Sequence, residues 1–70
     1  MAVNYNKLWK LLIDKGLNKT QLKEKAQIST NAIARLGRNE NVSMATLERI
    51  CNALSCSIQD IMEFVSTEEN

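Results

Sequence analysis

The chain has no proline, no histidine, and only two glycines and two cysteines among its 70 residues. Two cysteines exclude a framework of several disulfides, and two thiols without histidine disfavour a zinc site. No apolar run approaches the roughly 20 residues that cross a bilayer, and the first residues do not resemble a secretory signal. Missing proline and scarce glycine favour short helices joined by tight turns. We therefore expect a small, cytoplasmic, all-α protein without metal, cofactor or membrane association.

The length and composition indicate one globular domain. Seventy residues is about half the usual length of a domain, and a content of 44% hydrophobic and 24% charged residues is typical of a folded chain. We expect a core within residues 4–65 and a frayed acidic tail at 66–70. Since so short a chain needs support beyond its own core, we also expect a partner subunit.

Charge is strongly segregated although the net charge is only +1. Residues 1–38 contain eight Lys or Arg and two Asp or Glu, whereas residues 39–70 contain one Arg and six Asp or Glu. Such a division favours one face that meets an anion and another that stays away from it. The alternative is that the Lys-rich helices are merely soluble.

Apolar spacing and capping residues predict five short helices. The first covers residues 4–15 and closes at Gly16, which can adopt the left-handed conformation. Its apolar stripe follows helical spacing and consists of Tyr5, Leu8, Trp9, Leu12 and Ile13. Asn18 caps the second helix in a capping box with Gln21, and this helix ends near Gln27. Ser29 caps the third helix, over residues 30–37.

Two further helices are expected after a polar loop at residues 38–42. Ser43 caps the fourth, whose apolar stripe consists of Leu47, Ile50, Cys51 and Leu54. Ser57 caps the fifth, with Asp60 favourable near its N-terminus. The apolar side of the fifth helix consists of Ile58, Ile61, Met62 and Val65. Phe64 falls off this side, so it either closes the core or contacts a second subunit.

The second and third helices have the spacing of a helix-turn-helix. Their link is only about three residues long, and the second helix of such a unit can lie in the DNA major groove. Two helices that cross tightly need apolar residues at set offsets, and these positions hold Leu22, Ala26, Ile28, Ile33 and Leu36. Any pair of amphipathic helices can match this pattern, but the five-helix layout around it makes the match more specific.

The order of residues 17–22, 26–29 and 33–36 resembles the Cro/C1-type (XRE) regulators of bacteria and phages. Residues 43–47 and 56–61 resemble the starts of that family's fourth and fifth helices, so the resemblance covers about residues 5–65. It implies a five-helix, lambda-repressor-like DNA-binding domain. The sequence departs from the family pattern at Lys19, where Gln is usual, at Lys23, where Ala is usual, and at Gln27, where Gly is common.

The resemblance also implies which residues touch DNA. Those assigned to base edges are Ser29, Thr30, Asn31 and Arg35. Those assigned to phosphates are Lys19, Arg38 and Asn41. The chemistry agrees, because Asn pairs with adenine, Arg pairs with guanine and Thr can touch a thymine methyl. Ser29 has a second interpretation as a plain N-cap, and Thr30 and Asn31 as a solvated first turn.

The predicted function is a sequence-specific transcription regulator that binds double-stranded DNA as a homodimer on a palindromic operator. The alternative is a protein-interaction module, such as an antitoxin-like partner, that uses the acidic C-terminal half. No group of residues suggests catalysis, so we expect no enzyme and no catalytic residue, and nothing suggests a small-molecule effector domain. Cys51 is expected in the core. Cys56 is expected at the junction of the fourth and fifth helices, where it is either a plain structural residue or a redox sensor.

Overall fold

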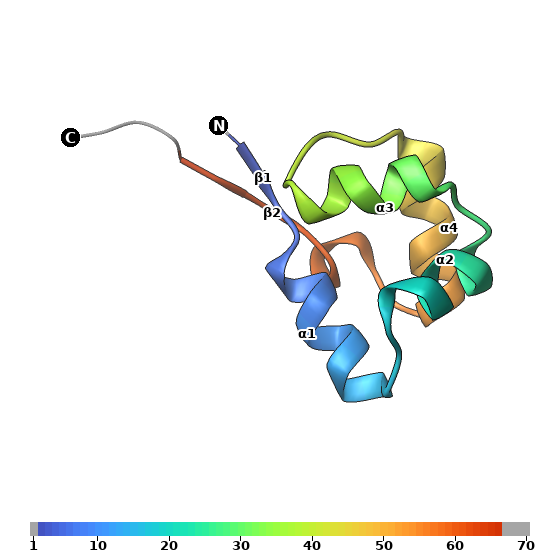
Figure 1. The fold of residues 1–70 in the computed structure, drawn as a ribbon. Coiled ribbons are helices and arrows are strands. Elements are labelled where there is room, and N and C mark those ends of the chain that lie inside the picture. The colour runs from blue at the N-terminus through green and yellow to red at the C-terminus, as the bar shows by residue number, and fades with distance from the viewer. Residues whose placement is uncertain (1, 67–70) are drawn as a thin grey trace.

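The computed structural model describes residues 2–66, which form four α-helices, one 3-10 turn and a two-stranded antiparallel ladder (Figure 1). In chain order the elements are β1 (Ala2–Asn4), α1 (Asn6–Lys15), α2 (Lys19–Ala26), α3 (Thr30–Gly37), α4 (Met44–Leu54), η1 (Ile58–Asp60) and β2 (Glu63–Val65). The expected tail lies outside the described residues apart from Ser66.

The predicted capping residues begin and end the helices. The Asn18 side chain accepts a hydrogen bond from the Gln21 amide at 2.8 Å, and the Gln21 side chain accepts one from the Asn18 amide at 2.9 Å. Ser43 Oγ accepts from the Thr46 amide at 3.1 Å, which starts α4. Gly16 ends α1 with φ +70°. These contacts satisfy amides and carbonyls that a helix leaves unpaired at its ends.

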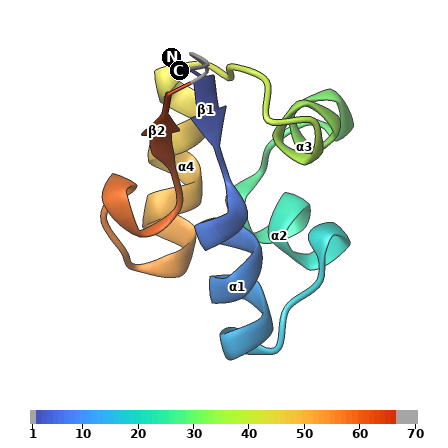
Figure 2. The ribbon, with the colours of Figure 1, turned by 90° about the vertical axis from the view of Figure 1, so that its left-hand side faces the viewer.

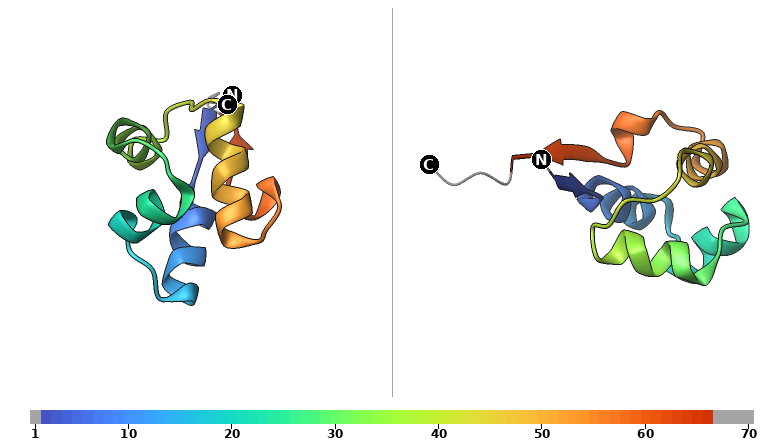
Figure 3. Two further views of the ribbon diagram at one scale, coloured as in Figure 1. Left: turned by 90° about the vertical axis from the view of Figure 1, so that its right-hand side faces the viewer. Right: turned by 90° about the horizontal axis from the view of Figure 1, so that it is seen from above.

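One core joins all the helices. Figures 2 and 3 show α2 and α3 on one side and α4 with the β1–β2 ladder on the other, while α1 crosses between them. The side chains that are fully or almost fully buried at the centre are Tyr5, Leu8, Leu22, Leu36, Ile50, Leu54 and Ile61. Burying each of these side chains stabilises the folded state by about 1.5–3 kcal/mol, and together they supply most of the stability. None of the helices within residues 2–66 has the length and hydropathy that a bilayer crossing needs.

The fifth helix was predicted wrongly. Residues 58–60 form a single 3-10 turn and residues 63–65 pair with residues 2–4 in an antiparallel ladder, with Val3 opposite Phe64. Ile61 is buried as expected, but Ile58 is 40% exposed. An eight-residue helix rich in β-branched residues is marginal. The same residues can hydrogen-bond to a second strand, and β1 is available for that pairing.

The first helix also differs from the expectation, in where it starts and in which residues it buries. It starts at Asn6 rather than Asn4, because Ala2–Asn4 is the partner strand of β2. Ile13 is 76% exposed rather than buried, and Trp9 is only half-buried. The buried face is centred on Leu8 and Leu12, with Leu11 partly buried on the edge opposite to the one where Ile13 was expected.

Candidate nucleic-acid interface

The turn between α2 and α3 is fixed from both sides. Gln27 adopts the left-handed conformation at φ +57°, and the Ile28 amide donates to the Lys23 carbonyl at 3.1 Å. Ile28 fills the corner and is almost completely buried, as the sequence predicts. From α4, Arg49 Nη1 donates to the Gln27 carbonyl at 3.0 Å. These contacts set the angle at which α3 leaves the turn.

The outer face of α3 carries the polar residues expected to read bases. Thr30, Asn31 and Arg35 are all exposed, while Ala32 and Leu36 face the core. Among the residues that the structure describes, the side chains of Asn31 and Arg35 have no hydrogen-bond partner. Their donors and acceptors are therefore available to a ligand on this face.

Thr30 and Ser29 are engaged with the protein itself. Lys23 Nζ donates to Thr30 Oγ1 at 3.1 Å, so the threonine hydroxyl already has a partner within the protein. Ser29 Oγ accepts a hydrogen bond from the Ala32 amide at 3.0 Å. Ser29 is thus the N-cap of α3, the second of its two interpretations.

Lys19, at the start of α2, lies beside the end of α3. Its Nζ is 4.7 Å from the centroid of the Trp9 ring, a cation–π contact. A Cβ built on Gly37 would lie 3.7 Å from the same Nζ. The ammonium is therefore held at the edge of α3, where a phosphate next to the helix would meet it.

Arg38, which is expected to contact a phosphate, has a guanidinium that is already paired with a carboxylate of the protein. Nε and Nη2 donate to the two carboxylate oxygens of Glu40 at 2.9 and 3.2 Å. These hydrogen bonds raise the pKa of Arg38 and lower the pKa of Glu40. Both groups are solvent-exposed, so the pair is a weak one that a phosphate can compete with.

Asn41 lies at the other edge of α3. It lines an open hollow of about 210 Å³ together with Asn31 and Arg35 of α3 and with Ser43, the N-cap of α4. Amides at a helix N-terminus attract phosphate. The hollow therefore combines an exposed amide side chain with a helix start close to α3.

The site geometry matches a known family. The family described as Cro/C1-type HTH DNA-binding domain matches residues 7–67. The chain belongs to the Cro/C1-type helix-turn-helix family. Among solved structures the chain is similar to the crystal structure of the transcriptional regulator VanUg (Form II), with a TM-score of 0.86 and 50% sequence identity over 89% of this chain and 83% of that one. A comparison with curated proteins found no match.

Cro/C1-type domains bind DNA, and the charge of this chain is arranged for it. Residues 18–38 span α2 and α3 and contain one acidic residue, Glu24. The basic residues in the same segment are Lys19, Lys23, Lys25, Arg35 and Arg38. Five basic residues and one acidic residue give the helix-turn-helix a net charge of +4, and a positive charge is what a phosphate backbone attracts.

Two residues support this Cro/C1-type site through long-range contacts that were not predicted from the sequence. Tyr5 is 1% exposed, its hydroxyl donates to the Glu40 carbonyl at 2.8 Å, and its amide donates to Asn39 Oδ1 at 3.1 Å. Arg49 holds the turn as described above. Both act over more than 20 residues of chain, and neither spacing nor composition signals such a contact.

Proposed function

We propose that this Cro/C1-type protein is a transcription regulator that recognises a specific DNA sequence and binds it as a homodimer on a palindromic operator. The observation that carries the proposal is the exposed face of α3, on which the side chains of Asn31 and Arg35 have no hydrogen-bond partner among the described residues. Cations flank this face. Asn and Arg are the side chains best suited to bidentate pairing with adenine and guanine.

The proposed contacts divide into reading and positioning. Asn31 and Arg35 read bases, and Thr30 contributes its methyl group, while Ser29 acts by starting α3. Lys19 and Asn41 hold phosphates on the two sides of α3, and Arg38 does so after leaving Glu40. Phosphate contacts set the register of the protein on DNA but carry no sequence information.

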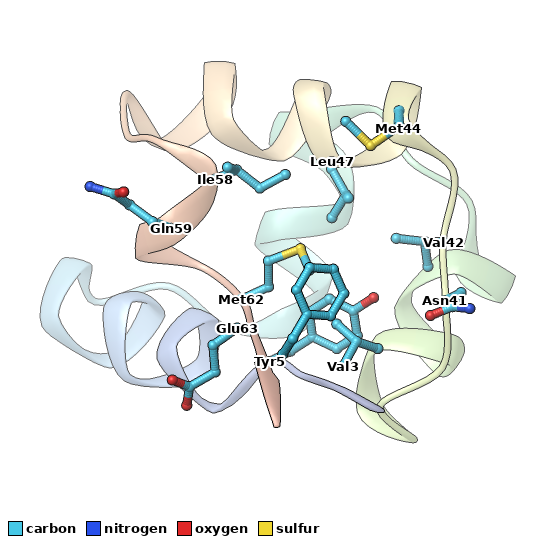
Figure 4. Close-up of a pocket in the computed structure, with 11 residues that line it drawn as sticks. Val3, Tyr5, Asn41, Val42, Met44, Leu47, Ile58, Gln59, Met62 and Glu63 are labelled. Carbon is cyan, nitrogen blue, oxygen red and sulfur yellow. The ribbon is translucent and has the colours of Figure 1, made fainter. Parts of the chain in front are cut away.

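An apolar groove supports the homodimer. It has a volume of about 470 Å³ and lies between the β1–β2 ladder, the start of α4 and η1 (Figure 4). Three large apolar side chains on it are open to solvent: Met44 is 72% exposed, Phe64 is 66% exposed and Ile58 is 40% exposed. Side chains of this size gathered on one face indicate a contact surface.

The second copy is the occupant that the ladder favours. Strands of three residues in a two-stranded ladder are marginal in water without further packing, and their outer edges are open to pairing. Phe64 lies on this ladder and also lines the groove. A two-fold axis beside it would bring each Phe64 to the partner's groove in a self-complementary contact.

A dimer also explains how so small a domain could bind an operator tightly enough. One small domain makes few base contacts, whereas two copies double them on half-sites about one helical turn apart. This is why we propose a palindromic operator rather than a single asymmetric site.

The groove also favours a second candidate function, a protein-interaction module, because an apolar surface could accept a segment of another protein. Sedimentation distinguishes the two. We expect wild type and Ile13→Ala, which removes an exposed apolar residue outside the groove, to dimerise, and Phe64→Ala to shift towards monomer while staying folded. Unchanged association of Phe64→Ala would contradict the proposed contact.

The DNA half of the proposal is tested by selecting bound sequences from a random DNA library. We expect a two-fold symmetric consensus, and binding to it that weakens steeply as salt is added, because several phosphates are neutralised. Failure to enrich any sequence, with no binding at low salt, would contradict the regulator and favour the interaction module.

A further inference from the structure

The two cysteines meet at the end of α4, away from the polar face of α3. Ser55 adopts the left-handed conformation at φ +54°, and the Cys56 amide donates to the Cys51 carbonyl at 3.0 Å. In a helix end of this kind, the two residues joined by that hydrogen bond bring their side chains into contact. The two thiols also interact with each other, since each side chain shifts the pKa of the other. The fold therefore holds a dithiol at this position.

The dithiol is reduced and reachable. Both cysteines are free and half-buried. Cys56 lines an open cavity of about 360 Å³. The charged residues lining the same cavity are Lys7, Lys10, Asp14, Lys15 and Asp60. Lys7 is already paired with Glu63 at 3.8 Å, so the ammonium groups of Lys10 and Lys15 are the ones that can meet a small anionic reactant.

We propose that Cys51 and Cys56 are a reversible modification site that forms an intramolecular disulfide by exchange with a small anionic disulfide of the glutathione type. The Cys56 thiolate attacks one sulfur of oxidised glutathione and releases one glutathione as the thiol. The Cys51 thiolate then attacks Cys56 Sγ and releases the second. The protein loses two protons and two electrons, and the glutathione disulfide gains them.

The surroundings of the thiols set the pH dependence of this exchange. Burial raises the pKa of both Cys51 and Cys56 above the ordinary value, although Lys15 lowers that of Cys56 to a smaller extent. Asp60, in η1, opposes ionisation of both. Because only the thiolate reacts, exchange is slow at neutral pH and accelerates by about tenfold per pH unit between pH 7 and 8.5.

The test uses the reduced full-length chain with an excess of oxidised glutathione, followed by intact mass spectrometry and thiol alkylation. We expect wild type to become two hydrogens lighter, to release two glutathione molecules per chain and to lose both alkylation sites. Cys51→Ser and Cys56→Ser are the matched controls, and each should stop at a mixed disulfide with one glutathione. The oxidised wild type should also melt about 5–10 °C higher than the reduced form, since a closed loop restricts the unfolded chain.

Three results would overturn the inference. One is a stable wild-type adduct with one or two glutathiones, which would mean that the second thiol does not reach the first. Another is a native chain that does not react while the urea-unfolded chain does. The third is oxidation into disulfide-linked dimers with no intramolecular product. None of these measurements involves DNA, so a result that overturns the disulfide inference can be told apart from one that contradicts the proposed DNA-binding function.

Discussion

Replacing Tyr5 with Phe removes one hydroxyl from the contact that ties α1 to the loop after α3. The ring stays in place, so no cavity forms, and the amide of residue 5 still donates to Asn39. What is lost is the hydrogen bond of 2.8 Å to the Glu40 carbonyl. Glu40 is an exposed residue, so water can replace the hydroxyl in part, and we expect a loss of about 1 kcal/mol in the free energy of unfolding. For a domain of this size that lowers the melting midpoint by about 4–8 °C.

Alkaline pH gives this substitution a second, independent signature. Burial raises the pKa of Tyr5 above its ordinary value of 10.0, so above pH 10 the unfolded chain releases the phenolic proton before the folded one does. The folded state then binds more protons than the unfolded state, and stability falls as pH rises. Phe has no such proton. The stability difference between wild type and Tyr5→Phe should therefore shrink above pH 10.

Urea unfolding followed by far-ultraviolet circular dichroism measures both effects, with the slope m expected to be equal for the two proteins. Ionisation of lysines and cysteines is common to both proteins and cancels in the difference. A loss below about 0.3 kcal/mol at pH 7 would refute the role of this hydrogen bond. So would a difference that stays constant between pH 9 and 11.

Three further substitutions test other contacts. Gln27→Gly should stabilise the protein by about 0.5–1 kcal/mol in urea unfolding, because glycine adopts φ +57° without the strain of a side chain, whereas Gln27→Ala should bring no gain. Ser29→Ala should cost about 1 kcal/mol through loss of the α3 cap, and Ser29→Asp should keep most of the stability. Glu40→Gln should strengthen binding to every DNA sequence in fluorescence anisotropy, most at low salt, because Arg38 is released and a carboxylate is removed. Unchanged or weaker binding would contradict the view that Glu40 restrains Arg38.

The sequence predicted the parts of the fold that depend on neighbouring residues. Asn18, Ser29 and Ser43 cap the helices at which the sequence places them, and Gly16 ends α1. A cap involves residues only three or four positions apart, so a short stretch of sequence contains all the residues that identify it. The helix-turn-helix was predictable for the same reason.

Contacts between distant residues were not predictable from one sequence. The stretch around Phe64 has apolar spacing compatible with a helix, and only the presence of β1, about 60 residues earlier in the chain, makes a ladder possible. Pairing of that kind overrides a local pattern. The same limit applies to the site. The polar face of α3 was predicted, but the ion pair between Arg38 and Glu40 was not. Which side chains pair in this loop depends on the loop conformation, which the sequence alone does not give.

DNA binding by Asn31→Ala and Arg35→Ala, measured on the selected operator and on random DNA at several salt concentrations, tests the central claim most directly. We predict that each variant loses about 1–3 kcal/mol on the operator and much less on random DNA. Lys19→Ala, the phosphate-contact control, should weaken both DNAs alike and reduce the salt slope by about one unit. Circular dichroism should show that all three variants stay folded, since none of these residues is buried. Equal losses on operator and random DNA for Asn31→Ala and Arg35→Ala would contradict the account, because α3 would then bind DNA without reading its sequence.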